Sequence, residues 1–386
     1  MKKTLLCLAI LTASSTALAS EQYNGRLSGM SGAGYVTGGY SDGVLLNSSL
    51  GTSHSETDDF AFVINAGVLG SDKDDLIDSM DDLVDYIDYL DGLSSQADLT
   101  PDMADKLIGY LENVDDKTVQ ATASGSLVIA IPNDIVSISL IAKAHGTLGV
   151  ATLVDEDDYA LIENSINEPF DPNELQSSVL GKGALIREVG VAFSKAFAES
   201  EDRKLLVGIT PKKVTVETIL YEATVEEYDE DDFDADDYTV KSSANSLDAG
   251  ITFIDGNLRY GLAVSDVISN DFDTITREKF ELATKSTAAF GYMKDWLTAE
   301  VSLDLNATEA YGLGGDTQML RAGVEVSPFS WLQLRAGFQQ DMENTLADTY
   351  SIGFGLSPFD VVNLDIAAYT GDNETVGGAI QLGLRL

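Results

Sequence analysis

The chain has 386 residues, and its 64 acidic residues outnumber its 23 basic residues, which gives a formal net charge of −41. A chain of this sign repels phosphate groups, so its composition argues against nucleic acid as a partner. The single cysteine, Cys7, lies near the start of the chain, which excludes thiol chemistry from the remainder.

The first 20 residues have the pattern of a secretory signal peptide. Lys2 and Lys3 form a basic start, an apolar run follows from Thr4 to Ala13, and Ala17-Leu18-Ala19 supplies the small residues of a cleavage site. This pattern predicts export of the chain and cleavage after Ala19 or Ser20. The apolar run is too short to span a bilayer as a helix.

A small acidic helical insert is predicted over residues 72–112, after a first short strand at Phe60–Ala66. From Asp72 to Asp91, apolar residues recur at helical spacing and aspartates fill the other face, which is typical of an amphipathic helix. Thr100 as a cap and Pro101 in the first turn predict a second helix. An insert of this kind among strands indicates either a plug or an excursion into solvent.

The rest of the chain predicts hairpins in which tight turns alternate with longer polar loops. The predicted tight turns are Pro132-Asn133-Asp134, Thr210-Pro211-Lys212-Lys213, Asp255-Gly256-Asn257, Lys294-Asp295, Ser327-Pro328-Phe329-Ser330 and Ser357-Pro358-Phe359-Asp360. The longer loops include residues 155–183, with a short helix, Glu226–Asp237 and Ser269–Glu278. Short turns at one end and long loops at the other are typical of outer-membrane barrels.

The last hundred residues alternate apolar and polar side chains, strand after strand. Leu297, Val301 and Leu303 fall on one face of such a strand, and Glu300 and Asp304 fall on the other. Each run spans roughly 10 residues, the length that a tilted strand needs to cross a bilayer. Because every backbone polar group must be paired within hydrocarbon, the pattern predicts a closed sheet.

We therefore expect an all-β fold, a transmembrane antiparallel β-barrel of about 14 and up to 16 strands, formed by residues 59–386. Five charged residues on the polar faces are the candidates for the lumen. They are Glu300, Asp304, Arg321, Glu325 and Arg335. They can pair with one another and with a plug, which is the interpretation that we favour, or set ion selectivity.

Nothing in the residues predicts catalysis, a cofactor or a metal site. The two histidines, His54 and His145, have no motif around them, so a membrane hydrolase built on either is a minor alternative. The loop Glu226–Asp237 carries nine carboxylates in twelve residues but lacks the spacing of an EF-hand. It is interpreted as a solvated, self-repelling loop, with diffuse association of divalent cations as the alternative.

Several short segments carry a resemblance to a known family. In chain order they are Gly29–Val36, Asn47–Leu50, Asp58–Phe60, Asp74–Asp78, Glu188–Val191, Val207–Lys212, Ser302–Asn306 and Arg321–Glu325. With these segments the chain resembles the FadL-type outer-membrane transport family, in the branch named for the conjugal transfer protein TraF. The resemblance implies a monomeric barrel in the outer membrane of a Gram-negative bacterium, in contact with its lipid and lipopolysaccharide.

The resemblance also implies that residues 21–58 form a hatch inside the barrel. Met30, Gly32, Gly34 and Asn47 are the residues of its motif. FadL-like members carry hydrophobic compounds inward, so a passive channel for small hydrophobic solutes is expected, or an envelope component that works with proteins of the conjugation apparatus. No ligand-binding residue follows from either. The alternative is a barrel that anchors a structural or adhesive surface protein, whose acidic loops bind a partner.

Overall fold

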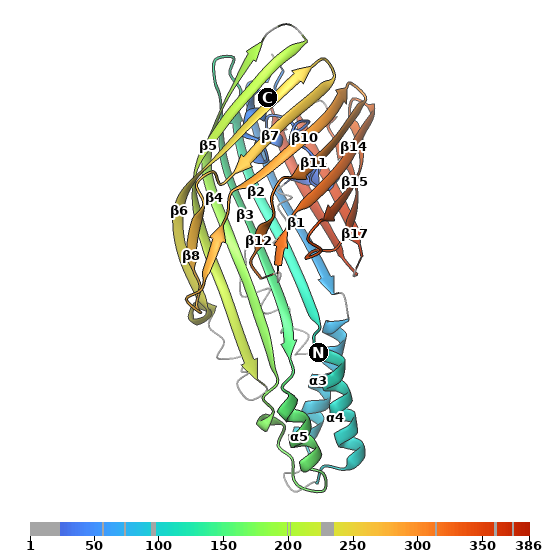
Figure 1. The fold of residues 1–386 in the computed structure, drawn as a ribbon. Coiled ribbons are helices and arrows are strands. Elements are labelled where there is room, and N and C mark those ends of the chain that lie inside the picture. Colours follow the sequence, from blue (N-terminus) through green and yellow to red (C-terminus); the bar gives the residue numbers. More distant parts are fainter. Residues whose placement is uncertain are drawn as a thin grey trace.

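The computed structural model describes residues 24–55, 58–72, 75–93, 98–198, 200, 202–224, 235–312, 315–358, 361–372 and 374–386. Within these residues, fourteen antiparallel strands close into a barrel, which confirms the predicted fold class (Figure 1). The barrel strands are β1 (Ala61–Asp72), β2 (Thr118–Ile131), β3 (Ser137–Leu153), β4 (Ser178–Ala198), β5 (Arg203–Thr224), β6 (Thr239–Asp255), β7 (Leu258–Ser265), β10 (Lys285–Lys294), β11 (Leu297–Asp304), β14 (Met319–Phe329), β15 (Leu332–Asp341), β16 (Thr349–Leu356), β17 (Val362–Gly371) and β18 (Val376–Arg385). The first and last strands pair to complete the circle, with Ala61 opposite Arg385.

The two faces of the barrel wall differ as the alternation predicts. Outward side chains such as Val301, Leu334 and Ile352 are apolar and exposed, whereas inward side chains such as Glu300 and Arg335 are buried. An apolar outer face and a polar inner face are what a closed sheet in a bilayer requires.

The two ends of the barrel also differ. Short turns, such as the one between β6 and β7, and the C-terminus lie at the upper end in Figure 1, whereas the helices Leu76–Asp91, Pro101–Val114 and Glu156–Asn164 lie at the lower end. Phe329 and Trp331 stack at the short-turn end, with ring centroids 5.5 Å apart. Both rings are about half exposed, as is usual for aromatic residues at a membrane interface.

One predicted turn is wrong. Thr210-Pro211-Lys212-Lys213 lies inside β5, which runs without interruption from Arg203 to Thr224. Proline suits a turn because its φ is fixed, but it is also tolerated in a strand where its missing N–H is not needed. The β4–β5 pairing accordingly lapses between the pairs Gly190–Lys212 and Phe193–Ile209, while the β5–β6 pairing continues through Pro211.

The turn predicted at Ser327–Ser330 falls later, because β14 continues to Phe329 after a register shift beyond Val326. Residues 1–23, which include the predicted signal peptide, lie outside the described residues, as do residues 359–360 of the last predicted turn. The acidic loop Glu226–Asp237 is described only from residue 235 onward.

A cap of three helices lies beyond the strands at the long-loop end (Figure 1). It consists of α3 (Leu76–Asp91), α4 (Pro101–Val114) and α5 (Glu156–Asn164). Thr100 caps α4 by accepting a hydrogen bond from the Met103 backbone N–H. Apolar residues of these helices form one buried cluster, so the predicted insert folds as a helical cap and not inside the lumen. Across the described residues, no helix is both long and apolar enough to cross a membrane.

We expect Leu107→Ala to loosen this cap and leave the barrel folded. Leu107 is fully buried in the cap cluster, and truncation of such a residue costs about 3 kcal/mol of folding free energy. Hydrogen exchange across residues 76–114 should therefore rise. Asp105→Ala, at an exposed position of the same helix, is the matched control. An equal rise in exchange throughout the barrel strands would contradict the prediction.

Two hairpins fold back against the inner face of the wall near the long-loop end. One consists of β8 (Asn270–Asp273) and β9 (Lys279–Leu282), and the other of β12 (Thr308–Ala310) and β13 (Gly315–Thr317). Phe272, Phe280 and Tyr311 pack with Ile186 and Val214 of the wall. These hairpins therefore narrow the lumen near its long-loop end.

Candidate functional site

Residues 24–55 fill the lumen and are called the plug below. The plug contains one turn of helix, α2 (Gly25–Ser28), and two short 3-10 helices, η1 (Gly43–Leu45) and η2 (Ser48–Thr52). Three residues of the predicted hatch motif, Met30, Gly32 and Gly34, lie in its buried first half, and Asn47 lies in its second half. The plug is therefore the feature that decides whether the lumen is open.

Glu300 holds the plug from β11. Its carboxylate accepts hydrogen bonds from the backbone N–H groups of four consecutive plug residues, 34 to 37, at 2.6, 2.6, 3.0 and 2.9 Å. The hydroxyl of Thr37 donates a fifth hydrogen bond at 2.8 Å. Successive N–H groups that converge in this way form a concave anion site. The wall supplies the anion and the plug supplies the site.

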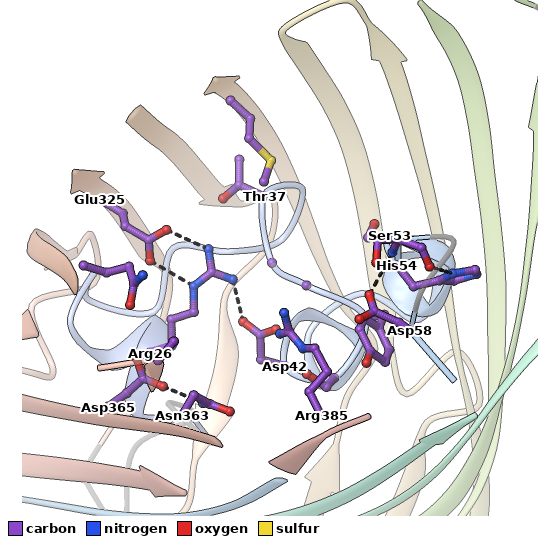
Figure 2. A pocket seen from close by; sticks show the side chains of 18 of the residues that line it. Arg26, Thr37, Asp42, Ser53, His54, Asp58, Glu325, Asn363, Asp365 and Arg385 are labelled. Carbon is purple, nitrogen blue, oxygen red and sulfur yellow. Dashed lines mark hydrogen bonds and ion pairs between the residues drawn. The ribbon is translucent and has the colours of Figure 1, made fainter. Parts of the chain in front are cut away.

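A chain of ion pairs holds the plug from β14, the strand that pairs with β11, and from the strands beyond it (Figure 2). Arg26 of the plug contacts Asp42 at 2.8 Å, also in the plug, and donates two hydrogen bonds to Glu325 of β14 at 3.0 and 3.1 Å. Glu325 also contacts Arg335 of β15 at 2.6 Å, and Arg335 contacts Asp365 of β17 at 2.7 Å. Glu325 and Arg335 stand directly opposite each other in the β14–β15 pairing.

The charge on Arg26 is stabilised by this arrangement. Burial disfavours the guanidinium ion, but Glu325 and Asp42 outweigh that cost and raise the pKa of Arg26 above its usual value. For Tyr40 of the plug, burial is the main cause, and the pKa of its phenol is raised to about 12. Both groups therefore keep their ordinary protonation state at neutral pH.

The remaining predicted lumen residues form a second ion-pair group. Asp304 contacts Arg321 at 2.9 Å and Lys285 at 3.2 Å. It also accepts a hydrogen bond from the Thr287 hydroxyl at 2.8 Å. The guanidinium of Arg321 lies 5.7 Å from the ring centroid of Tyr35 in the plug. The structure thus places all five predicted lumen residues on the inner wall. Four of them form two ion-pair groups, and Glu300 binds the plug by itself.

The second half of the plug packs against glycines of the wall. The Asn47 amide donates hydrogen bonds to the Tyr35 carbonyl at 2.7 Å and to Thr252 at 3.1 Å. A Cβ atom on Gly250 would lie 1.9 Å from the Asn47 side-chain oxygen, and one on Gly208 would lie 2.1 Å from the Ser48 carbonyl oxygen. Glycine at these two positions is what lets the plug backbone approach the wall this closely.

A buried charged cluster that the sequence analysis missed lies further along the lumen. The ammonium of Lys212 contacts Glu188 at 2.7 Å, Asp248 at 2.8 Å and Asp266 at 2.9 Å, and Lys143 contacts Glu188 at 3.2 Å. Asp266 lies just beyond the end of β7, in the segment that leads to β8. The alternation around Lys212 indicates a strand, whereas Pro211 favours a turn.

Cavities lie on both sides of the plug. At the short-turn end is a vestibule of about 900 Å³, lined by Arg26, Tyr40 and Asp42 of the plug and by wall residues such as Gln333 (Figure 2). Toward the hairpins is a chamber of about 130 Å³, lined by Tyr35 of the plug and by Phe280 of β9. The plug separates the two cavities.

The two histidines fall in different cavities. His54 lines the vestibule, where its ring meets Tyr40 edge-on with centroids 6.1 Å apart. His145 lines the chamber. The plug therefore lies between them, and the structure does not bring them together as one site.

Comparisons with known proteins bear on both the family and the fold. A family model described as F plasmid transfer operon, TraF, protein matches residues 44–304, which is more than half of the chain. Two solved structures of the TodX monoaromatic hydrocarbon channel are similar in fold. The deltaS2S3 mutant has a TM-score of 0.53 and 9% identity over 95% of this chain and 98% of that one. The deltaS2 mutant has a TM-score of 0.50 and 10% identity over 94% and 97%.

A third structure, of a FadL homologue from Pseudomonas aeruginosa, has a TM-score of 0.49 and 10% identity over 95% of this chain and 99% of that one. By sequence, no curated protein matches the chain. At identities this low, the two TodX structures bear on the fold alone, and they agree with the closed barrel described above.

Proposed function

The chain belongs to the TraF family of the F plasmid transfer operon, as its resemblance predicted, and on that basis we propose that it is a plugged channel of the Gram-negative outer membrane. Its apolar outer face and interfacial aromatic residues support residence in a bilayer. The predicted signal peptide supports export, and the proposal assigns no reaction to the chain.

The observation that carries the proposal is the position of the plug between two cavities. Its described contacts with the wall are hydrogen bonds, ion pairs and close packing, such as those of Glu300 and Arg26, so it can move without breaking a covalent bond. Movement would join the vestibule to the chamber. The chamber is lined by apolar Ile186, Phe280 and Leu282 as well as by charges, and the TodX structures of the same fold are described as those of a monoaromatic hydrocarbon channel. We therefore propose passive passage of small hydrophobic solutes.

A covalent lock on the plug tests this proposal. The hydroxyl oxygens of Ser31 in the plug and Ser351 in β16 are hydrogen-bonded at 2.8 Å, so cysteines at these two positions would bring their sulfur atoms near the roughly 2.05 Å separation of a disulfide bond. Cells that produce the Ser31→Cys/Ser351→Cys variant should take up a hydrophobic fluorescent probe, 1-N-phenylnaphthylamine, at the rate of cells without the protein. A reducing agent should restore the faster uptake seen with the unmodified chain.

The matched control for the lock is Ser31→Cys alone, which cannot form the bridge within the chain. It should behave as the unmodified protein with and without reductant. If the doubly substituted protein forms the disulfide and uptake stays fast, the plug does not gate passage. If the unmodified protein never accelerates uptake, the channel proposal fails.

A second role is favoured by the family description itself, which names a plasmid transfer operon. An envelope component of conjugation need not conduct, so the same locked variant separates the two roles. Donor cells with the locked plug should transfer plasmid at the normal frequency if only the presence of the barrel matters. Loss of transfer upon locking would instead connect plug movement to conjugation.

A further inference from the structure

An apolar pocket of about 280 Å³ lies where the helical cap meets β3, β4 and β5 at the long-loop end of the barrel. Ile77, Met80 and Val84 of α3 line one side, and Val150 of β3 and Val179 of β4 line the other. Ile77, Met80 and Val84 are only partly buried, although each lies on the apolar face of α3. A partly unfilled apolar pocket of this size suits one small apolar molecule.

The charges around this pocket have one sign. Its charged lining residues among those described are Asp81, Asp88 and Asp91, and none is basic. The whole of α3 carries six aspartates and no lysine, arginine or histidine. The nearby Lys117 is directed to the Ser79 hydroxyl at 3.1 Å and does not line the pocket. A carboxylate that enters the pocket would therefore lose water and meet like charges, without a cationic partner.

We propose that this pocket binds small apolar molecules that are neutral or positively charged, and that it excludes hydrophobic acids. The proposal deepens the function proposed above, on which it rests for the idea that bound solutes are cargo. Repulsion from three carboxylates at the rim sets the preference against anions, and the same carboxylates attract an ammonium group. The selection occurs at the long-loop end, before a solute reaches the hairpins and the plug.

Three ligands with the same eight-carbon chain test the charge preference: octanol, octylammonium and octanoate. The protein is placed in nanodiscs with ¹³C-methyl-labelled methionine, and the Met80 methyl signal is followed as each ligand is added at pH 7. Met80 lines the pocket and Met293 lines the vestibule at the other end, so Met293 reports changes that are not local. We expect octanol and octylammonium to shift the Met80 signal, and octanoate to require about tenfold higher concentration.

The Asp81→Asn/Asp88→Asn/Asp91→Asn variant should bind octanoate nearly as well as octanol, and added salt should reduce the discrimination in the unmodified protein. The result that overturns the proposal is octanoate binding as tightly as octanol, or a Met80 signal that responds to none of the three. If probe uptake fails in the cell assay while the Met80 signal still discriminates by charge, the channel proposal is wrong and the pocket proposal stands.

Discussion

Replacing Glu300 by alanine should free the plug from β11 and lower the free energy that holds it in the lumen by about 3–5 kcal/mol. The Glu300 carboxylate accepts all five hydrogen bonds that residues 34–37 direct at it. Alanine would leave four backbone N–H groups buried without this acceptor. An unpaired buried polar group costs about 1–3 kcal/mol, so the plug should favour conformations that expose these groups to water.

Hydrogen exchange measures this effect directly. If the plug opens without unfolding of the barrel, a loss of about 3 kcal/mol in the free energy that holds it corresponds to roughly a hundredfold faster hydrogen exchange in the plug. We expect that increase within residues 24–55 and little change in the barrel strands. Glu217→Ala removes a partly exposed carboxylate from β5, where it pairs with Arg187 at 2.5 Å and Lys241 at 3.2 Å, and should leave exchange in the plug as it was. Unchanged exchange at residues 34–37 in the Glu300 variant would show that the carboxylate does not hold the plug.

The architecture was predictable because it depends on local patterns. The alternation of Leu297, Val301 and Leu303 with Glu300 and Asp304 requires only that a strand present its two faces to different surroundings. The helical period from Asp72 to Asp91 likewise requires only one face to be buried. Strand number follows within narrow limits from the spacing of turns, and the closed barrel contains fourteen.

The contacts of the lumen were not predictable in the same way. The alternation places Glu300 on the inward face, but its partners are backbone N–H groups, the closest in sequence 263 residues away. Every residue type except proline has such a group, so the sequence does not indicate which of them will bind Glu300. The glycines at 208 and 250 give no local signal either, because their role is to admit the plug. The pairing of Glu325 with Arg335 is predictable from the sequence, because the two residues lie on either side of one hairpin turn.

Pro211 shows how a strong local signal can mislead. Its fixed φ and missing N–H are equally compatible with a turn and with a strand that lacks one ladder bond. The neighbouring alternation supports the strand, because Lys212, Val214 and Val216 are buried while Lys213 is exposed. Weighing that alternation above the proline would have placed Lys212 in the lumen.

Lys212→Met is expected to be the most damaging single change in the wall away from the plug. The ammonium of Lys212 lies within 2.9 Å of one oxygen from each of Glu188, Asp248 and Asp266. Its removal leaves three carboxylates close together, with Lys143 at 3.2 Å from Glu188 as a remaining cation. Removal of one partner from a buried ion-pair group costs about 3–5 kcal/mol, so the folded barrel should lose its heat resistance on unboiled gels at a markedly lower temperature.

The neighbouring lysine provides the control for this experiment. Lys213→Met makes the same chemical change one residue along, at an exposed outward position, and should leave the transition temperature within a few degrees of that of the unmodified protein. Adding Asp266→Asn to Lys212→Met removes one of the stranded carboxylates and should recover part of the loss. If the two single variants melt alike, the cluster does not stabilise the barrel. If Asp266→Asn recovers nothing, the loss comes from packing and not from unpaired charge.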